Sequence, residues 1–227
     1  CKVYFFWYNQ NMKKFIEENK FYLKSIILIF GINALIYFLI KLFINDYHLI
    51  SIPLDNKIPF IKEFIYIYMI WYPFLIISYY KVWKYNKEKY GKLVLVTVTS
   101  LLILYMFFIL YPTKVDRPEV NSFHDLTTFV TYVTFLTDTP VNCFPSGHCL
   151  LCFVLMFSTF RDKKLPIKFR FIVSVLGTLI IFSTLFVKQH VILDAVGSLI
   201  LAIFTYFIIT NTKYFKKIER KIDKMME

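Results

Sequence analysis

LVLVTVTSLLILYMFFILY occupies residues 93–111 and contains no charged side chain. An α-helix needs about 20 apolar residues to cross the hydrocarbon core of a bilayer, so this stretch predicts a membrane span. The composition of the 227-residue chain agrees, since 58% of its residues are hydrophobic, 20% are aromatic and 19% are charged. A soluble domain has no use for so much apolar surface, whereas lipid accommodates it. We therefore expect an integral membrane protein.

Five further apolar segments approach the same length. The six predicted spans cover residues 25–44, 64–80, 93–111, 145–160, 169–187 and 191–210. Pro73 lies inside the second span and predicts a kink there, because proline cannot donate the backbone hydrogen bond of an inner helical turn. No internal repeat or low-complexity linker divides the chain. The sequence thus predicts an all-α fold, a polytopic bundle of six transmembrane helices that forms a single membrane domain over residues 1–227.

Basic residues are concentrated in alternate loops between these spans. Of the 27 lysines and arginines, 21 fall in four segments: 1–24, 81–92, 161–170 and 213–227. Cytoplasmic loops carry such an excess, so both termini are predicted to be cytoplasmic, with 1–24 as an N-terminal segment and 213–227 as a basic tail. A nucleic-acid-binding protein would gather its charge on one folded face. The net charge of +12 therefore indicates membrane topology and no nucleic-acid partner.

The predicted outer loop over residues 113–144 contains an amphipathic stretch. Its apolar residues recur at helical spacing and are Phe123, Leu126, Phe129, Val130, Val133 and Leu136. The pattern predicts a short helix, which either lies in the outer membrane interface or packs on the bundle as a loop helix.

Three of the four cysteines cluster around one histidine, as Cys143, His148, Cys149 and Cys152. Structural zinc sites hold their cysteines in pairs on loops. Cys149 and Cys152 instead fall inside a predicted apolar helix, where free cysteine behaves as a small hydrophobic residue. We expect no metal site from this set.

Two outer-facing segments carry residues suited to an anion. Arg117, near the outer end of the third span, offers a planar guanidinium that matches phosphate oxygens. The fourth span begins at Pro145, a residue suited to a first helical turn, and the following amides are expected to be free to bind an anion. Ser146 adds a hydroxyl, Gly147 allows close approach to the backbone, and His148 adds a titratable proton.

A third outer-facing segment contains Asp194 inside the sixth span. An ionisable residue at that depth is costly and indicates function. His190 lies four residues earlier, so on a helix the two side chains share a face and can touch. A carboxylate in this position orients a histidine and raises its basicity, as in a nucleophile relay. The alternative is an aspartate that merely hydrogen-bonds between helices.

These segments match the motifs of a known family. The chain resembles the type 2 phosphatidic acid phosphatase superfamily of integral membrane enzymes, whose motifs are KxxxxxxRP, PSGH and SRxxxxxHxxxD. The second motif is intact at residues 145–148, and the third matches at Ser183, His190 and Asp194. The first motif matches at Arg117-Pro118 alone.

The resemblance implies a role for each matched residue. His190 attacks phosphorus to give a phosphohistidine, Asp194 orients it, and His148 protonates the leaving alkoxide before it activates water. The phosphate oxygens are held by Arg117, Ser146 and the Gly147 amide. The family needs no metal and no cofactor.

Two positions depart from the family pattern. Leu110 replaces the lysine of the first motif, and Thr184 replaces the arginine of the third. Lys114 and Lys188 lie near the same predicted surface, so we expect one or both to supply the missing positive charge.

The resemblance favours a lipid phosphatase of the cell membrane, whose active site faces the extracytoplasmic side and whose substrate is a lipid phosphate or diphosphate monoester. A lipid phosphotransferase, similar to inositol-phosphorylceramide and sphingomyelin synthases, is the second hypothesis. A non-catalytic membrane protein such as a transporter that retains the fold is the third. The Lys-, Ile-, Phe- and Tyr-rich composition is typical of a low-GC bacterium.

Overall fold

A computed structural model of the chain describes residues 11–44, 46–120, 124–160 and 162–226. The structure is 76% helical, which confirms the predicted all-α fold. Residues 11–18 are helical. The helices that follow are α2 (Lys20–Ile27), α3 (Asn33–Phe43), α4 (Ile65–Met69), α5 (Trp71–Tyr85), α6 (Lys87–Leu110), α7 (Leu126–Thr137), α8 (Gly147–Phe160), α9 (Ile167–Phe186), α10 (Ile192–Asn211) and α11 (Lys213–Met226).

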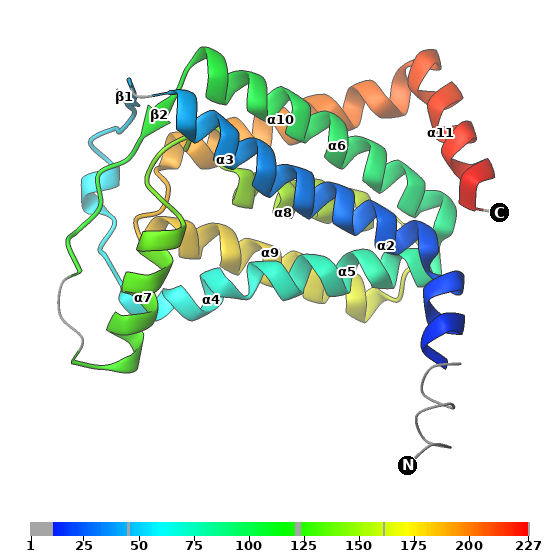
Figure 1. Ribbon diagram of the computed structural model, residues 1–227, viewed down its shortest axis with the longest axis horizontal. Coiled ribbons are helices and arrows are strands. Elements are labelled where there is room, and N and C mark those ends of the chain that lie inside the picture. The colour runs from blue at the N-terminus through cyan, green and yellow to red at the C-terminus, as the bar shows by residue number, and fades with distance from the viewer. Residues whose placement is uncertain (1–10, 45, 121–123, 161, 227) are drawn as a thin grey trace.

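Shorter elements connect these helices, and the two strands among them lie at one end of the molecule (Figure 1). A π-helical turn, η1 (Leu28–Ile32), joins α2 to α3 without a break. Strands β1 (His48–Leu49) and β2 (Thr113–Lys114) pair in parallel. Two 3-10 turns, η2 (Asp55–Lys57) and η3 (Lys62–Phe64), lie between β1 and α4.

Within the described residues, four helical segments are long and apolar enough to cross a membrane. They cover Lys20–Phe43, Lys87–Leu110, Ile167–Phe186 and Ile192–Asn211, and they correspond to the first, third, fifth and sixth predicted spans. The other two predicted spans are shorter helices. The six-span arrangement therefore stays a prediction, as does the cytoplasmic location of both termini.

The second predicted span is divided into two helices. The break falls at Ile70, between α4 and α5. Pro73 has no N–H to donate to the carbonyl of Met69, so the regular ladder is interrupted where the sequence predicted a kink. The α5 helix continues to Tyr85, past the predicted end of the span.

The fourth predicted span is the short central helix α8. It packs against α5, α6, α9 and α10, and Leu150, Leu151 and Leu155 on it are almost fully buried. Surrounding helices replace lipid around α8, so a length of 14 residues is sufficient. Irregular backbone beyond its ends is tolerated at membrane depth only where protein or water surrounds it.

The two ends of the bundle differ in character. The turn between α5 and α6, the turn between α8 and α9, and α11 lie at the end where α2 begins (Figure 1). The strands, α7, and the loops before α8 and α10 lie at the opposite end (Figure 1). The described parts of the arginine- and lysine-rich segments thus lie at the end of the bundle opposite the PSGH and HxxxD motifs (Figure 1).

The predicted amphipathic helix in the outer loop is present as α7. Asp125 caps it by accepting a hydrogen bond from the Thr128 N–H, at 2.8 Å. Lys62 donates to the Asp125 carboxylate and holds its pKa below the usual range. The threonine face of α7 is buried, while Leu126 and Leu136 are exposed, so the helix does not pack on the bundle by these apolar residues. Its location at the membrane interface stays a prediction. Phe123 lies outside the described residues.

Gly197 sets how closely α10 approaches the loop before α8. A Cβ at this position would lie 2.6 Å from the Phe144 ring, whereas one at Gly31 would come no closer than 4.0 Å to Ile27. We expect Gly197→Ala to destabilise the protein by about 1–2 kcal/mol, because overpacking outweighs the gain in helix propensity. Thermal unfolding in detergent measures this, with Gly31→Ala as the matched control. Equal unfolding temperatures for the two variants would contradict this packing.

Candidate active site

Helices α8 and α10 begin beside each other, joined by hydrogen bonds. The Ser146 N–H donates to the Asp194 carbonyl at 3.2 Å. The Ser198 hydroxyl lies 2.8 Å from the Ser146 carbonyl and 2.7 Å from the Asp194 carbonyl. These contacts bring the PSGH and HxxxD segments together, although their first residues, Pro145 and His190, are 45 positions apart in the sequence.

His190 and Asp194 form a buried pair. The Nδ1 atom of His190 lies 3.0 Å from Oδ2 of Asp194, and Asp194 is fully buried. The contact was predicted, but the predicted helical geometry is wrong, because α10 begins at Ile192 and His190 lies in the preceding loop. Asp194 also accepts from the Val191 N–H at 3.0 Å and so caps the helix. With Nδ1–H donated to the carboxylate, Nε2 keeps its lone pair.

Asp55, in the 3-10 turn η2, binds the start of the helix that carries Asp194. Its Oδ1 accepts from the Ile192 N–H at 2.9 Å, and its Oδ2 accepts from the Ile52 N–H at 2.8 Å. Asp55 therefore fixes the start of α10 to the loop after β1. A carboxylate at a helix N-terminus is stabilised by the helix dipole.

His148 faces His190 from the first turn of α8. The two ring centroids lie 5.9 Å apart. The His148 ring packs against Trp71 and Tyr68, with centroid distances of 4.3 and 4.7 Å. Its Nε2 lies 4.0 Å from Oδ2 of Asp138, which is too long for a hydrogen bond and close enough for a favourable charge contact.

Arg117 reaches the same place from the segment after β2. Its Nη1 donates to the Asp138 carbonyl at 2.6 Å, and its guanidinium lies 4.8 Å from the centre of the Phe135 ring. Burial lowers the pKa of Arg117, and the Asp138 carboxylate opposes that effect. Arginine nevertheless stays charged at neutral pH. The Tyr68 hydroxyl donates a hydrogen bond to the Asp138 carboxylate.

A cavity of about 480 Å³ joins these groups. Four residues that line it carry a buried side-chain nitrogen with no hydrogen-bond partner among the described residues: Arg117 (Nε), Asn142 (Nδ2), His148 (Nε2) and Gln189 (Nε2). Buried polar groups are almost always paired, so unpaired nitrogens on residues around one cavity are suited to binding an anion. The left-handed backbone of Asn142, with φ of 56°, allows its side chain to lie at the cavity wall.

The same region matches a family pattern. A sequence model of the PAP2 superfamily matches residues 93–218, which is more than half of the chain.

The chain belongs to the PAP2 superfamily. The resemblance drawn from the motifs is thereby confirmed, and membership supports phosphatase or phosphotransferase activity on phosphate esters. No curated protein and no solved structure is significantly similar to the chain.

The intact PAP2 motif at residues 145–148 is arranged differently from the prediction. Helix α8 begins at Gly147, two residues after Pro145, and the Ser146 hydroxyl accepts from the Cys149 N–H at 3.2 Å. The expectation that the Ser146 amide is free is wrong, since it donates to Asp194. Ser146 is fully buried and joins the two helices, whereas Gly147 and His148 line the cavity.

The two departures from the PAP2 pattern remove positive charge that the structure does not restore at the cavity. Leu110 is 75% exposed at the end of α6, and Thr184 is buried and donates its hydroxyl to the Ile181 carbonyl. Lys188 donates its ammonium to the carbonyls of Asp55 and Ile58, and Lys114 is exposed on β2. Neither lysine is among the described residues that line the cavity.

Four groups in this PAP2 site were not predicted from the sequence. Asn142 and Gln189 adjoin the motifs, but they are neutral and belong to no motif themselves. Asp138 follows the amphipathic stretch, and its position depends on how α7 packs. Cys143 lies in the sequence near the cysteines of α8, yet its thiol lies beside His190 and Asp194. Burial raises the pKa of that thiol well above its usual value, and the Asp194 carboxylate adds to the rise.

Substitution of Asp138 tests whether its carboxylate influences the protonation of His148. We expect Asp138→Asn to lower kcat for an alkyl phosphate about tenfold or more, because the carboxylate favours the protonated imidazole that a leaving alkoxide needs. The loss is expected to be smaller for p-nitrophenyl phosphate, whose phenolate leaves without protonation. Steady-state kinetics on both esters measure the difference, and Asp116→Asn, at an exposed position after β2, is the control. Equal losses on both esters would contradict a role through His148.

Proposed function

We propose that the protein is a lipid phosphatase that hydrolyses a phosphate or diphosphate monoester through a phosphohistidine on His190. One observation carries the proposal: a buried His–Asp pair adjoins a cavity whose lining includes four residues with an unpaired buried nitrogen. A tetrahedral anion seated there would meet the free side of the His190 ring.

The chemistry proceeds in two displacements. In the first, the Nε2 lone pair of His190 forms a bond to phosphorus while the P–O bond to the leaving group breaks. His148 donates its proton to the departing oxygen, and Asp194 stabilises the charge that develops on His190. In the second, His148 takes a proton from water, whose oxygen attacks phosphorus and releases His190 and inorganic phosphate.

Hydrogen bonds to the phosphate oxygens supply the remaining stabilisation. Arg117 is the cation at the cavity, and the side-chain amides of Asn142 and Gln189 are neutral donors. Donors fixed in a site that excludes water stabilise developing charge more than they would in solution. We propose that these two amides take over contacts that other family members make with Lys and Arg, and that Lys114 and Lys188 do not.

The cavity extends between apolar helices that we expect to lie in the membrane, which supports a lipid substrate. Its apolar wall comes from α2–α3, α5, α6 and α8, through residues that include Phe30, Leu101, Leu104, Phe108 and Leu151. Ala34, Tyr72 and Ile76 line it and are also exposed. The α2 helix packs on α5, whereas α3 packs on α6. Helices α5 and α6 are joined by a turn at the far end of the bundle and diverge toward the site end (Figure 1). A hydrocarbon chain entering there from lipid would leave its phosphate near His190.

The distribution of basic residues supports an active site on the outer face. The four lysine- and arginine-rich segments, in their described parts, belong to the end of the bundle opposite the site (Figure 1). A positive-inside orientation would make that end cytoplasmic.

Transfer to an alcohol is the second candidate, favoured by the departures at Leu110 and Thr184. It uses the same phosphohistidine and differs only in the acceptor. Phosphate release by the purified protein, measured with and without diacylglycerol or a polyol, separates the two reactions. Phosphatase activity predicts stoichiometric free phosphate in both conditions, whereas transfer predicts a phosphorylated alcohol and little free phosphate.

The phosphohistidine is the most direct test of the reaction. We expect His148→Ala to accumulate protein-bound phosphate from ³²P-labelled substrate that carries a p-nitrophenyl leaving group, because attack still occurs and water is no longer activated. The label should be stable in alkali and lost in acid. We expect no label in His190→Ala.

A label that persists in His190→Ala would refute the assignment of the nucleophile. Full biological function of His190→Ala would instead support the non-catalytic alternative, in which the fold is retained by a transporter or another membrane protein.

The lipid chain is tested by filling its proposed entrance. We expect Ala34→Trp to reduce turnover of a long-chain lipid phosphate about tenfold or more and to leave p-nitrophenyl phosphate turnover within about twofold, since a hydrocarbon chain is bound by apolar burial and the small ester is not. Leu35→Trp is the control, because Leu35 is 56% exposed on the same helix and does not line the cavity. Equal effects of Ala34→Trp on both substrates would exclude this path.

A further inference from the structure

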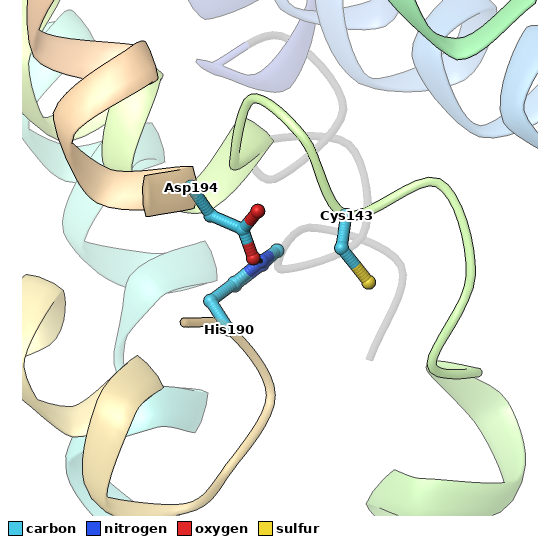
Figure 2. A group of neighbouring side chains, drawn as sticks. All are labelled: Cys143, His190 and Asp194. Atoms are coloured by element: carbon cyan, nitrogen blue, oxygen red, sulfur yellow. Dashed lines mark hydrogen bonds and ion pairs between the residues drawn. The ribbon is translucent and has the colours of Figure 1, made fainter. Parts of the chain in front are cut away.

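Three side chains of different chemistry meet at the inner wall of the candidate site (Figure 2). Cys143, His190 and Asp194 each present one ligand atom, and these atoms all lie within 4.8 Å of one another. They come from the loop before α8, the loop before α10 and the first turn of α10 (Figure 2). Cys143 is 2% exposed and Asp194 is fully buried.

Only one of the two carboxylate oxygens of Asp194 accepts hydrogen bonds from the described residues. Asp194 Oδ2 accepts from His190 and from the Val191 N–H, whereas its buried Oδ1 has no hydrogen-bond partner in the part of the chain that the structure describes. A buried anionic oxygen without a partner is costly, and a cation is one way to compensate it. Cys143 is a free cysteine.

The ligand set selects the kind of cation. Magnesium and calcium prefer oxygen ligands alone. A thiolate, an imidazole and a carboxylate together suit zinc, and three protein ligands leave a fourth position open toward the cavity.

We propose that Zn²⁺ binds Cys143 Sγ, a ring nitrogen of His190 and the Asp194 carboxylate, and that binding blocks the reaction at His190. Ligand atoms around tetrahedral zinc lie about 3.5 Å apart, so the group must contract by about 1 Å. The Cys143 N–H is held by the Thr113 hydroxyl at 3.1 Å, and rotation about the Cα–Cβ bond brings the sulfur inward while the backbone stays fixed. The thiol proton leaves to solvent when the cation binds.

Inhibition follows from either ring nitrogen, and this consequence rests on the proposed function. Zinc on Nδ1 leaves the proton of the neutral ring on Nε2, so the lone pair that attacks phosphorus is lost together with the Nδ1–Asp194 contact that orients the ring. Zinc on Nε2 occupies the lone pair that attacks phosphorus. The cation thus competes with phosphorylation of His190 in both geometries.

This set differs from the one weighed in the sequence. Cys149 and Cys152 are buried in α8, and Cys149 Sγ lies 3.6 Å from the Thr184 hydroxyl. Cys152 belongs to the hydrophobic core of the bundle and provides a matched control for Cys143.

Cobalt(II), a spectroscopic substitute for zinc, reports thiolate ligation by its near-ultraviolet charge-transfer absorption. We expect the full chain, purified in detergent without metal, to bind one Co²⁺ with this absorption and to lose it when Zn²⁺ is added. The absorption should disappear in Cys143→Ala and persist in Cys152→Ala. Cys143→Ser serves as a second variant if Cys143→Ala does not fold.

Zinc inhibition gives the functional readout. With each variant compared with its own zinc-free activity, half-inhibition should require about tenfold more Zn²⁺ or more in Cys143→Ala than in the unmodified protein, because one of three ligands is lost. Absence of the thiolate band in the unmodified protein, or equal zinc sensitivity of the two proteins, would overturn the proposal. The cobalt band does not depend on turnover, so an inactive protein that shows the band would refute the phosphatase assignment and leave the metal site standing.

Discussion

The hydrogen bond from the Ser146 N–H to the Asp194 carbonyl joins the starts of the two helices that carry the site. Ser198 strengthens the junction by contacting both carbonyl groups. Because the junction is buried, its polar atoms have no water to exchange with, and separating them would leave several unpaired groups. His148 and His190 project from this junction, and their separation of 5.9 Å follows from it. Ser146 therefore acts chiefly through position, by keeping two imidazoles on opposite sides of one small space.

The described residues that line the cavity include one arginine and no lysine, which is little positive charge for a site that would hold a phosphate. Arg117 is the guanidinium at the cavity, and it is oriented by the Asp138 carbonyl and the Phe135 ring. Asn142 and Gln189 contribute neutral donors, which lower the cost of keeping an unliganded site inside a membrane protein, since buried unpaired charge is far more expensive than a buried amide. Asp138 has two roles, because its backbone holds Arg117 while its carboxylate faces His148.

Local patterns predicted the parts of this structure whose causes are local. Continuous apolar runs located the long helices, and the break at Ile70 followed from the missing N–H of Pro73. The contact of His190 with Asp194 was predicted from a spacing of four, although the real cause is a helix cap, since Asp194 turns back toward Val191. The motif residues Arg117, Gly147 and His148 do line one cavity.

The predictions that the structure does not support concern the direction in which a side chain or amide points after the helices pack. Lys188 lies next to the site in sequence, yet its left-handed backbone sends the ammonium to the carbonyls of Asp55 and Ile58. Ser146 was expected to offer a free amide, which α10 occupies. Asp138, Asn142 and Gln189 carry no periodic or motif signal, and only the tertiary arrangement brings them to the cavity. A structure of the protein with orthovanadate, an analogue of the phosphoryl transition state, would test the site directly. Vanadium bonded to His190 Nε2, with its oxygens contacting Arg117, Asn142 and Gln189 and with His148 opposite His190, is the expected result; vanadate bound away from His190 would contradict the assignment.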